Sequence, residues 1–265
     1  MYQNSTAVML ASEQEAQMLS SIVVSKNGAI IVVDGGWTYD ADKLCQTIKK
    51  YGNKVDAWLV THPDPDHIGA LYRIMNNNMI DIDSIYCSLA TDEWYDYHTP
   101  DTSHFIRLFK DLLRYRNVIQ THKNMVINMN DIKICVLNDR YELENDSVNN
   151  SSVVYKVMVD DTSILYLGDL SYYGGEKLLA ETPPYLLSSD MVQMSHHGQA
   201  GVDLNVYKAI EPSIALWSTP YWLWTNNNGT GVYKTLEVRK WIDDLGCKSY
   251  TTANGDIYLD LIDLD

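Results

Sequence analysis

The sequence has no long apolar stretch and no basic leader. No run in its 265 residues approaches the roughly 18 consecutive apolar residues that a transmembrane helix needs. The first ten residues, MYQNSTAVML, contain no lysine or arginine and so do not resemble the start of a signal peptide. We therefore expect no membrane partner and a cytoplasmic location. A signal peptide removed earlier would leave no trace in this sequence.

Basic residues and closely spaced cysteines are also scarce. Lysine and arginine number 20 against 35 acidic residues, which gives a formal net charge of -15. Because such a chain repels polyanions, long nucleic acid is a disfavoured partner, and a nuclease is only a third option for the function. The cysteines show no C-x-x-C spacing, which favours free, buried thiols over disulfides. They are Cys45, Cys87, Cys135 and Cys247.

The rest of the composition is that of a folded globular protein, with 46% hydrophobic and 21% charged residues. Glycine and proline are scattered, so no linker is visible, and no internal repeat stands out. We expect one domain over residues 1–265, which is close to the upper size for a single hydrophobic core.

Strand-like runs gather in two sets, each accompanied by helical patterns. Residues 18–25 and 29–34 read as a hairpin, which begins the fold, and 55–60 read as a buried strand. In the clearest helix, 102–115, Phe105 and Leu108 belong to a core-facing stripe. Further strands are expected at 83–89, 131–138, 152–159, 162–169, 190–195, 213–218 and 255–261. Further helices are expected after a capping Asp40, from Asp66 onward, at 171–180, near 203–210 and around 238–245. Two sheets packed face to face and covered by helices, an α+β fold, is the simplest arrangement.

One motif carries most of the chemical information. THPDPDHIGA, residues 61–70, directly follows a buried strand and places His62, Asp64, Asp66 and His67 in a His-x-Asp-x-Asp-His pattern. Residues two apart in an extended segment point the same way, and the two prolines stiffen the backbone, so the four side chains can reach metal ions. The competing interpretation is a polar turn that leads into an aspartate-capped helix. Four ligand types within six residues favour the metal site.

Three other stretches end strands with ligand residues. Asp169 follows ILYLG, His196 and His197 follow QMS, and Asp34 ends IVVD. Sites in sheet proteins collect where strand ends meet one rim, so these residues could complete the same site. Each stretch is also good turn chemistry by itself, most of all the Asp-Gly-Gly run at Asp34.

Taken in order, IVVDGG, THPDPDHIGA, LYLGDL and SHHG resemble the metallo-β-lactamase fold superfamily over roughly residues 20–262. This sequence carries Asp64 where most members carry histidine. In this respect it is similar to the branch that includes the hydrolase domain of competence proteins of the ComEC type. A bacterial group with VDAWLVTHPxPDHIGA and HHGQxGV signatures is more similar still. The resemblance implies a four-layer αββα sandwich of two mixed β-sheets flanked by helices.

The same resemblance implies a dinuclear metal centre. Asp169 would bridge two divalent ions, with His62 and Asp64 on one ion and Asp66 and His67 on the other. One of His196 and His197 would be a ligand, with His197 favoured, and Asp34 would orient a ligand or the turn. Zinc is the expected metal, and manganese or iron also suits such donors. Two family histidines are missing, because residues 149–152 read Asn-Asn-Ser-Ser and the run 226–238 contains none.

The expected activity is hydrolysis of an ester-like bond by metal-activated water, with Asp66 and Asp169 as catalytic residues. Asp66 could accept the proton from that water or only anchor its metal. A small phosphoester or phosphodiester is the expected substrate. Tyr221, Trp222 and Trp224 could wall the mouth of the site, or Trp224 could be a core residue like Trp217. The missing histidines leave open a different function, a binding or sensing module that has the fold but has lost metal.

Overall fold

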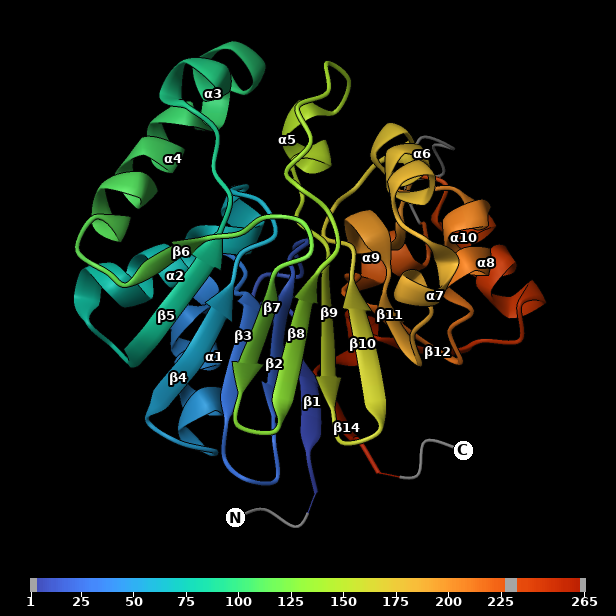
Figure 1. The fold of residues 1–265 in the computed structure, drawn as a ribbon, viewed down its shortest axis with the longest axis horizontal. Coiled ribbons are helices and arrows are strands. Elements are labelled where there is room, and N and C mark those ends of the chain that lie inside the picture. The colour runs from blue at the N-terminus through green and yellow to red at the C-terminus, as the bar shows by residue number, and fades with distance from the viewer. Residues whose placement is uncertain (1–3, 227–232, 263–265) are drawn as a thin grey trace.

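The fold is a sandwich of two seven-stranded sheets (Figure 1), seen in a computed structural model that describes residues 4–226 and 233–262. The first sheet has the order β14-β1-β2-β3-β4-β5-β6. Its strands are β1 (Thr6–Met9), β2 (Ser20–Val24), β3 (Ile30–Asp34), β4 (Lys54–Leu59), β5 (Asp81–Cys87), β6 (Val118–Gln120) and β14 (Ile257–Asp260). The pairs from β14 to β3 are antiparallel and those from β3 to β6 are parallel.

The second sheet has the order β13-β12-β11-β10-β9-β8-β7. Its strands are β7 (Val126–Met129), β8 (Ile132–Val136), β9 (Tyr155–Val159), β10 (Thr162–Tyr166), β11 (Met191–Gln193), β12 (Ile214–Trp217) and β13 (Lys248–Thr251). Antiparallel pairing runs from β7 to β10 and parallel pairing from β10 to β13. Both sheets are therefore mixed, as expected.

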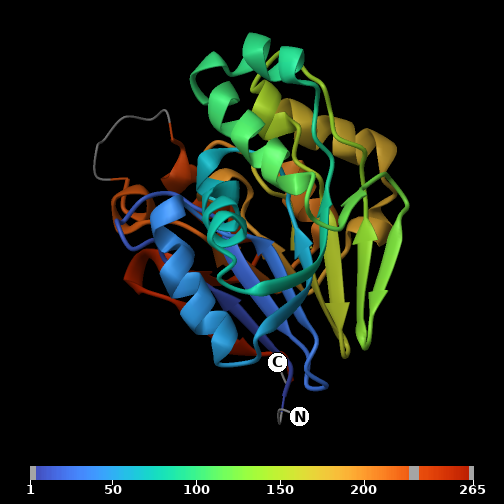
Figure 2. The same cartoon turned by 90° about the vertical axis from the view of Figure 1, so that its left-hand side faces the viewer.

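Helices cover the outer face of each sheet (Figures 1 and 2). The first sheet packs against α1 (Ala41–Lys49), α2 (Pro65–Asn77) and α4 (Pro100–Leu113). The second packs against α6 (Tyr172–Glu181), α8 (Leu204–Ile210) and α10 (Thr235–Asp244). Shorter helices are α3 (Asp92–His98), α5 (Ser147–Asn150), α7 (Pro184–Leu187), α9 (Tyr221–Trp224), η1 (Thr38–Asp40), η2 (Ser195–Gly198) and η3 (Thr252–Asn254). The four-layer αββα sandwich is confirmed.

Successive side chains along a strand point to opposite faces of the sheet, so the core is divided into layers. On β3, Ile31 and Val33 face the second sheet, whereas Ile30 and Val32 face the helices. A strand buried on both faces must be apolar at every position, which explains the unbroken run IIVV. Polar ties join the sheets, since the Tyr155 hydroxyl donates to the Val60 carbonyl oxygen at 2.9 Å. This hydrogen bond joins the two sheets where β4 ends and β9 begins.

Several local predictions were wrong. The fold begins with β1 and not with the predicted hairpin, and β6, β7, β13 and α3 were missed because these elements are short or polar. The Asp40 carboxylate does not cap α1; it accepts from the backbone N–H groups of Glu13 and Trp37 at 2.7 and 3.1 Å. Leu108 is 38% exposed, so it lies outside the core-facing stripe of α4.

The four cysteines are free thiols, and Cys135 is partly exposed whereas the other three are buried. Burial raises the pKa of the Cys87 thiol to about 12. Within residues 4–226 and 233–262, no helix is both long and apolar enough to span a bilayer.

Candidate metal centre

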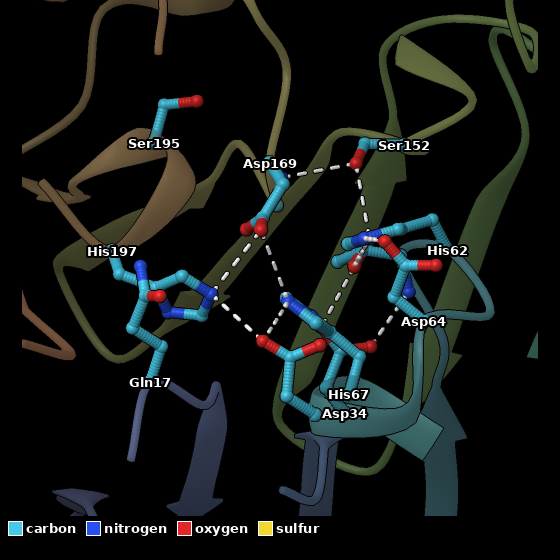
Figure 3. Close-up of polar contacts among 12 residues, drawn as sticks. Gln17, Asp34, His62, Asp64, His67, Ser152, Asp169, Ser195 and His197 are labelled. Atoms are coloured by element: carbon cyan, nitrogen blue, oxygen red, sulfur yellow. Dashed lines mark hydrogen bonds and ion pairs between the residues drawn. The ribbon is translucent and has the colours of Figure 1, made fainter. Parts of the chain in front are cut away.

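The ligand-type residues meet at the carboxyl ends of parallel strands from both sheets. Asp34 ends β3 and His62 follows β4 in the first sheet, while Asp169 follows β10 and His197 follows β11 in the second. Parallel strands present their carboxyl ends at one sheet edge, which brings residues far apart in sequence into contact. Figure 3 shows these side chains converging from the two sheets.

Asp34 is the hub of the polar network on the first sheet. One carboxylate oxygen accepts from the Thr61 backbone N–H at 2.8 Å, and the other contacts the Thr61 hydroxyl and His67 Nδ1, both at 2.7 Å. A proton on His67 Nδ1 is held by this carboxylate, so the Nε2 lone pair is free to face the centre. Asp34 itself is fully buried and has φ +56°, a conformation that aspartate tolerates better than most residues.

His62 is oriented from its other ring nitrogen. Its Nδ1 lies 3.1 Å from the Thr61 hydroxyl and 3.2 Å from the Ser152 hydroxyl, so Nε2 faces the centre (Figure 3). Asp64 Oδ2 lies 3.5 Å from His62 Nε2. Asp64 occupies the N-cap position of α2, yet its side chain accepts no capping hydrogen bond. The interpretation of this motif as an aspartate-capped helix therefore does not account for Asp64.

The second sheet supplies His197 from an unusual turn. His196 and His197 have φ of +52° and +56°, and Gly198 follows at +79°. This turn places His197 Nε2 3.1 Å from Asp66 Oδ2 and 3.2 Å from Asp169 Oδ2. The Thr219 hydroxyl holds the turn by donating to the His197 carbonyl oxygen at 2.6 Å. The His196 ring centroid is 6.1 Å from that of His197, and His196 belongs to neither of the two donor groups described below.

Asp169 is fixed by a glycine turn between the two sheets. Gly168 has φ +57°, and a Cβ there would lie 2.7 Å from Ser152 Oγ and 2.9 Å from Thr61 Cβ. Ser152 Oγ accepts from the Asp169 backbone N–H at 3.0 Å. Only glycine allows this close approach, which sets Asp169 Oδ2 3.3 Å from His67 Nε2.

The donor atoms fit a metal ion by burial and by geometry. His62 Nε2, His67 Nε2, His197 Nε2 and Asp169 Oδ1 are all buried and have no hydrogen-bond partner among the described residues. Buried polar atoms that make no hydrogen bond are costly, and a metal ion bound among these four atoms would serve as their common partner. Two groups of ligand atoms lie within 4.8 Å of one another: His62 with His67 and Asp169, and Asp66 with His67 and His197. Imidazole with carboxylate is a donor set for zinc, manganese or iron.

For the pKa values of the charged groups in the centre, pairing between opposite charges has a larger effect than burial. Burial disfavours the charged imidazole of His197, but Asp169 and Asp66 raise its pKa to about 9. In the same way, burial is overcome at His67, where Asp169, Asp34 and Asp66 hold the pKa well above its ordinary value. Despite burial, His197 and His67 keep the pKa of Asp169 well below its usual range and lower the pKa of Asp66. Both carboxylates are therefore ionised at neutral pH.

The three aromatic side chains proposed as a wall have different surroundings. Trp224 packs edge-on against buried Trp217, with ring centroids 5.2 Å apart, and beneath the Arg239 guanidinium. It is a packing residue. Trp222 Nε1 donates to the Glu15 carbonyl oxygen at 3.0 Å, and Tyr221 is 52% exposed. Residues 227–232, within the histidine-free run 226–238, lie outside the described residues.

Sequence reasoning missed Thr61 and Ser152, which contact His62, and Thr219, which supports His197. The Asn-Asn-Ser-Ser run was noticed only for its lack of histidine, although Ser152 in it contacts both His62 and the backbone of Asp169. A hydroxyl next to a strand end carries too weak a signal to predict such contacts from one sequence.

Similar structures align with nearly the whole chain. The metallo-beta-lactamase fold protein YhfI from Bacillus subtilis aligns with TM-score 0.61 and 13% identity, covering 96% of this chain and 99% of that one. CmlA, a diiron beta-hydroxylase from Streptomyces venezuelae, aligns with TM-score 0.60 and 11% identity over 98% of this chain and 55% of that one. A diphosphatase from the PhnP family aligns with TM-score 0.54 and 13% identity over 98% and 99%. At these identities the likeness shows the fold alone.

The sequence itself was compared with curated proteins and with family models. No curated protein matches it. The family model described as the metallo-beta-lactamase superfamily matches residues 17–214, which include Asp34, the THPDPDHIGA motif, Asp169 and the histidine pair. This match covers well over half of the sequence and agrees with the fold. The chain belongs to the metallo-beta-lactamase superfamily.

Proposed function

We propose that the protein is a metal-dependent hydrolase that cleaves an ester-like bond in a small phosphoester or phosphodiester. The observation that carries this proposal is the group of three buried imidazole nitrogens and one buried Asp169 carboxylate oxygen that lie near one another without hydrogen-bond partners among the described residues. The superfamily match supports an enzyme, and the diphosphatase among the similar structures supports a phosphorus-centred ester.

We infer that the two donor groups hold two divalent ions, with zinc as the expected metal. His62 and Asp169 would contribute to one ion and Asp66 and His197 to the other, while His67, which belongs to both groups, would bind one of the two ions through Nε2. Asp169 Oδ2 is close to the Nε2 atoms of both His67 and His197, which supports a shared role for this carboxylate. This grouping differs from the one implied by resemblance, in which Asp64 was paired with His62. Asp64 is 25% exposed and lies at the rim, where it could complete the first ion's ligands. His197 is the proposed ligand of the histidine pair.

When bound, the ions would supply an activated water near neutral pH and stabilise negative charge on the ester. The chain's own contribution is orientation and proton transfer. Asp34 keeps the proton of His67 on Nδ1, and the Thr61 and Ser152 hydroxyls orient His62. Asp66 is ionised and 18% exposed, so its carboxylate can accept a proton at the solvent side of the centre.

Asp169→Ala tests this function directly. With zinc, manganese or iron added, the wild-type protein should hydrolyse bis-(p-nitrophenyl) phosphate, and the variant should lose at least roughly 100-fold in kcat/KM because a shared carboxylate is removed. Asp190→Ala, at a solvent-facing carboxylate that bonds Ser163, is the matched control and should keep wild-type turnover.

Metal-dependent turnover that survives Asp169→Ala would contradict the assigned centre. A folded protein with no bound metal and no turnover of phosphodiesters or simple esters would instead favour the binding or sensing module.

A further inference from the structure

A cavity of about 380 Å³ lies between the chain before β2, the chain after β12 and the η3 turn. Its lining includes Met18, Lys43, Ser218, Tyr221 and Asn254. This volume falls within the range of small-molecule sites. None of the residues assigned to the metal centre lines it.

Two hydrogen bonds connect the walls of this cavity to the metal centre. On one side, the Leu19 backbone N–H, next to Met18, donates to the Asp66 carbonyl oxygen at 3.2 Å. On the other side, Thr219, next to Ser218, donates its hydroxyl proton to the His197 carbonyl oxygen at 2.6 Å. The cavity is therefore built on the two chain segments that border Asp66 and His197.

Gln17 lies at this junction. Its neighbours Ala16 and Met18 both line the cavity. Figure 3 shows its side chain among the residues of the centre, on the same side as His197. The amide Nε2 is buried and has no hydrogen-bond partner among the described residues. A buried amide donor without a partner needs an acceptor, which a bound substrate can supply.

The charges of the cavity do not suit an anion. Lys43 is the only cation in the lining, and its ammonium group contacts the Ala11 carbonyl oxygen at 2.8 Å, Asp256 at 2.7 Å and Glu13 at 3.4 Å. Since an ammonium group has three N–H donors, Lys43 has none left for a ligand. A phosphate or carboxylate in this cavity would lack a counter-charge, so an uncharged group fits better.

The polar groups that remain free match hydroxyl groups. Ser218 is 2% exposed, and its hydroxyl has no hydrogen-bond partner in the described part of the chain. Asn254 and Tyr221, whose side chains carry an amide and a hydroxyl, also line the cavity. Each of these groups can both donate and accept, as can a ligand hydroxyl. Ala16, Met18 and the Tyr221 ring offer apolar surface to the C–H groups of a sugar or polyol.

We propose that this cavity binds an uncharged sugar or polyol group of the substrate, while the ester bond lies at the metal centre and Gln17 Nε2 donates to the substrate between them. This inference rests on the proposed function for the ester, but the cavity itself needs no metal. The substrate class that follows is an ester, most simply a phosphodiester, of a neutral polyhydroxyl alcohol.

Ligand-observed NMR on the chelator-treated full chain tests the cavity without any hydrolysis. The probes are methyl α-glucoside, myo-inositol and glycerol, and glucuronate is the charged counterpart of the glucoside. We expect at least one neutral probe to bind and glucuronate to bind several-fold more weakly. Ser218→Ala and Asn254→Ala should each lower the affinity for the neutral probe by roughly five- to tenfold, which is the effect of one lost hydrogen bond. Asn76→Ala, at an exposed position on α2, is the matched control and should change nothing.

Asn254 is exposed, so its substitution leaves folding intact even if Ser218→Ala does not. Failure of all three neutral probes to bind, equal binding of glucuronate, or unchanged affinity in Asn254→Ala would each overturn the proposal. These outcomes are independent of turnover, which separates this inference from the proposed function.

Discussion

Asp34 acts on two imidazoles at once. It contacts His67 Nδ1 directly and reaches His62 through the Thr61 hydroxyl, so one buried carboxylate fixes both rings with Nε2 toward the centre. The sequence predicted an orienting role for Asp34, but the link through Thr61 depends on the three-dimensional path of the chain after β4.

Asp34→Asn should therefore weaken metal binding while the fold is kept. The amide replaces one acceptor oxygen by an NH₂ donor, so it cannot accept all three hydrogen bonds from Thr61 and His67 as the carboxylate does, and loss of such a partner typically costs roughly 10- to 100-fold in metal affinity. Zinc competition against a chromophoric chelator would measure this. Asp42→Asn, at an exposed partner of Arg73, is the control. Equal affinity for Asp34→Asn and wild type would show that Asp34 only stabilises the turn.

At the scale of elements, the helix α9 holds the segment that precedes β2. The Trp222 indole N–H donates to the Glu15 carbonyl oxygen, across more than two hundred residues of sequence. The aromatic run was interpreted as a possible substrate wall because its composition suits that role, but composition does not show which partner each ring meets.

Trp222→Ala should loosen residues 11–18 without removing metal. Amide hydrogen exchange in this segment should become faster, because the hydrogen bond and the packing that hold Glu15 are lost. Tyr185→Ala, at a residue that is 75% exposed, provides the comparison. Unchanged exchange in residues 11–18 would mean that other contacts hold the segment.

Some of the elements, and the site residues at their ends, could be predicted from the sequence. Long apolar strands such as β3 and β4, and the strand ends that carry Asp34, His62 and Asp169, follow from local patterns. The short strands β6 and β13 pair with β5 and β12, and this pairing rather than their own composition makes them strands. The separation of His197 from His196 arises from a left-handed turn that is stabilised by Thr219 on another segment, which no local pattern encodes.

For the whole molecule, the charged cluster predicts an unusual pH dependence of stability. In the folded chain the pKa of His197 rises from 6.5 to about 9, and that of His67 also rises. Their ion pairs with Asp66 and Asp169 therefore stabilise the fold fully below pH 6.5, and this stabilisation is lost as pH rises through about 9.

The Tm of chelator-treated protein should fall between pH 6.5 and 9, and His197→Gln should reduce that fall. Added zinc should largely remove it, because a metal ion binds the neutral imidazoles. Thermal melts with and without zinc across this range provide the measurement. A Tm of chelator-treated protein that stays constant or rises would contradict the assigned pairing.

The central claim is that the converging ends of two sheets form a dinuclear metal centre. Elemental analysis of protein purified without chelators tests it most directly, since it counts ions per chain whatever the substrate. We predict close to two divalent ions per chain, with zinc the main metal, and near-complete loss in Asp169→Ala. A well-folded chain that contains no metal and takes up none from added zinc, manganese or iron would contradict the account.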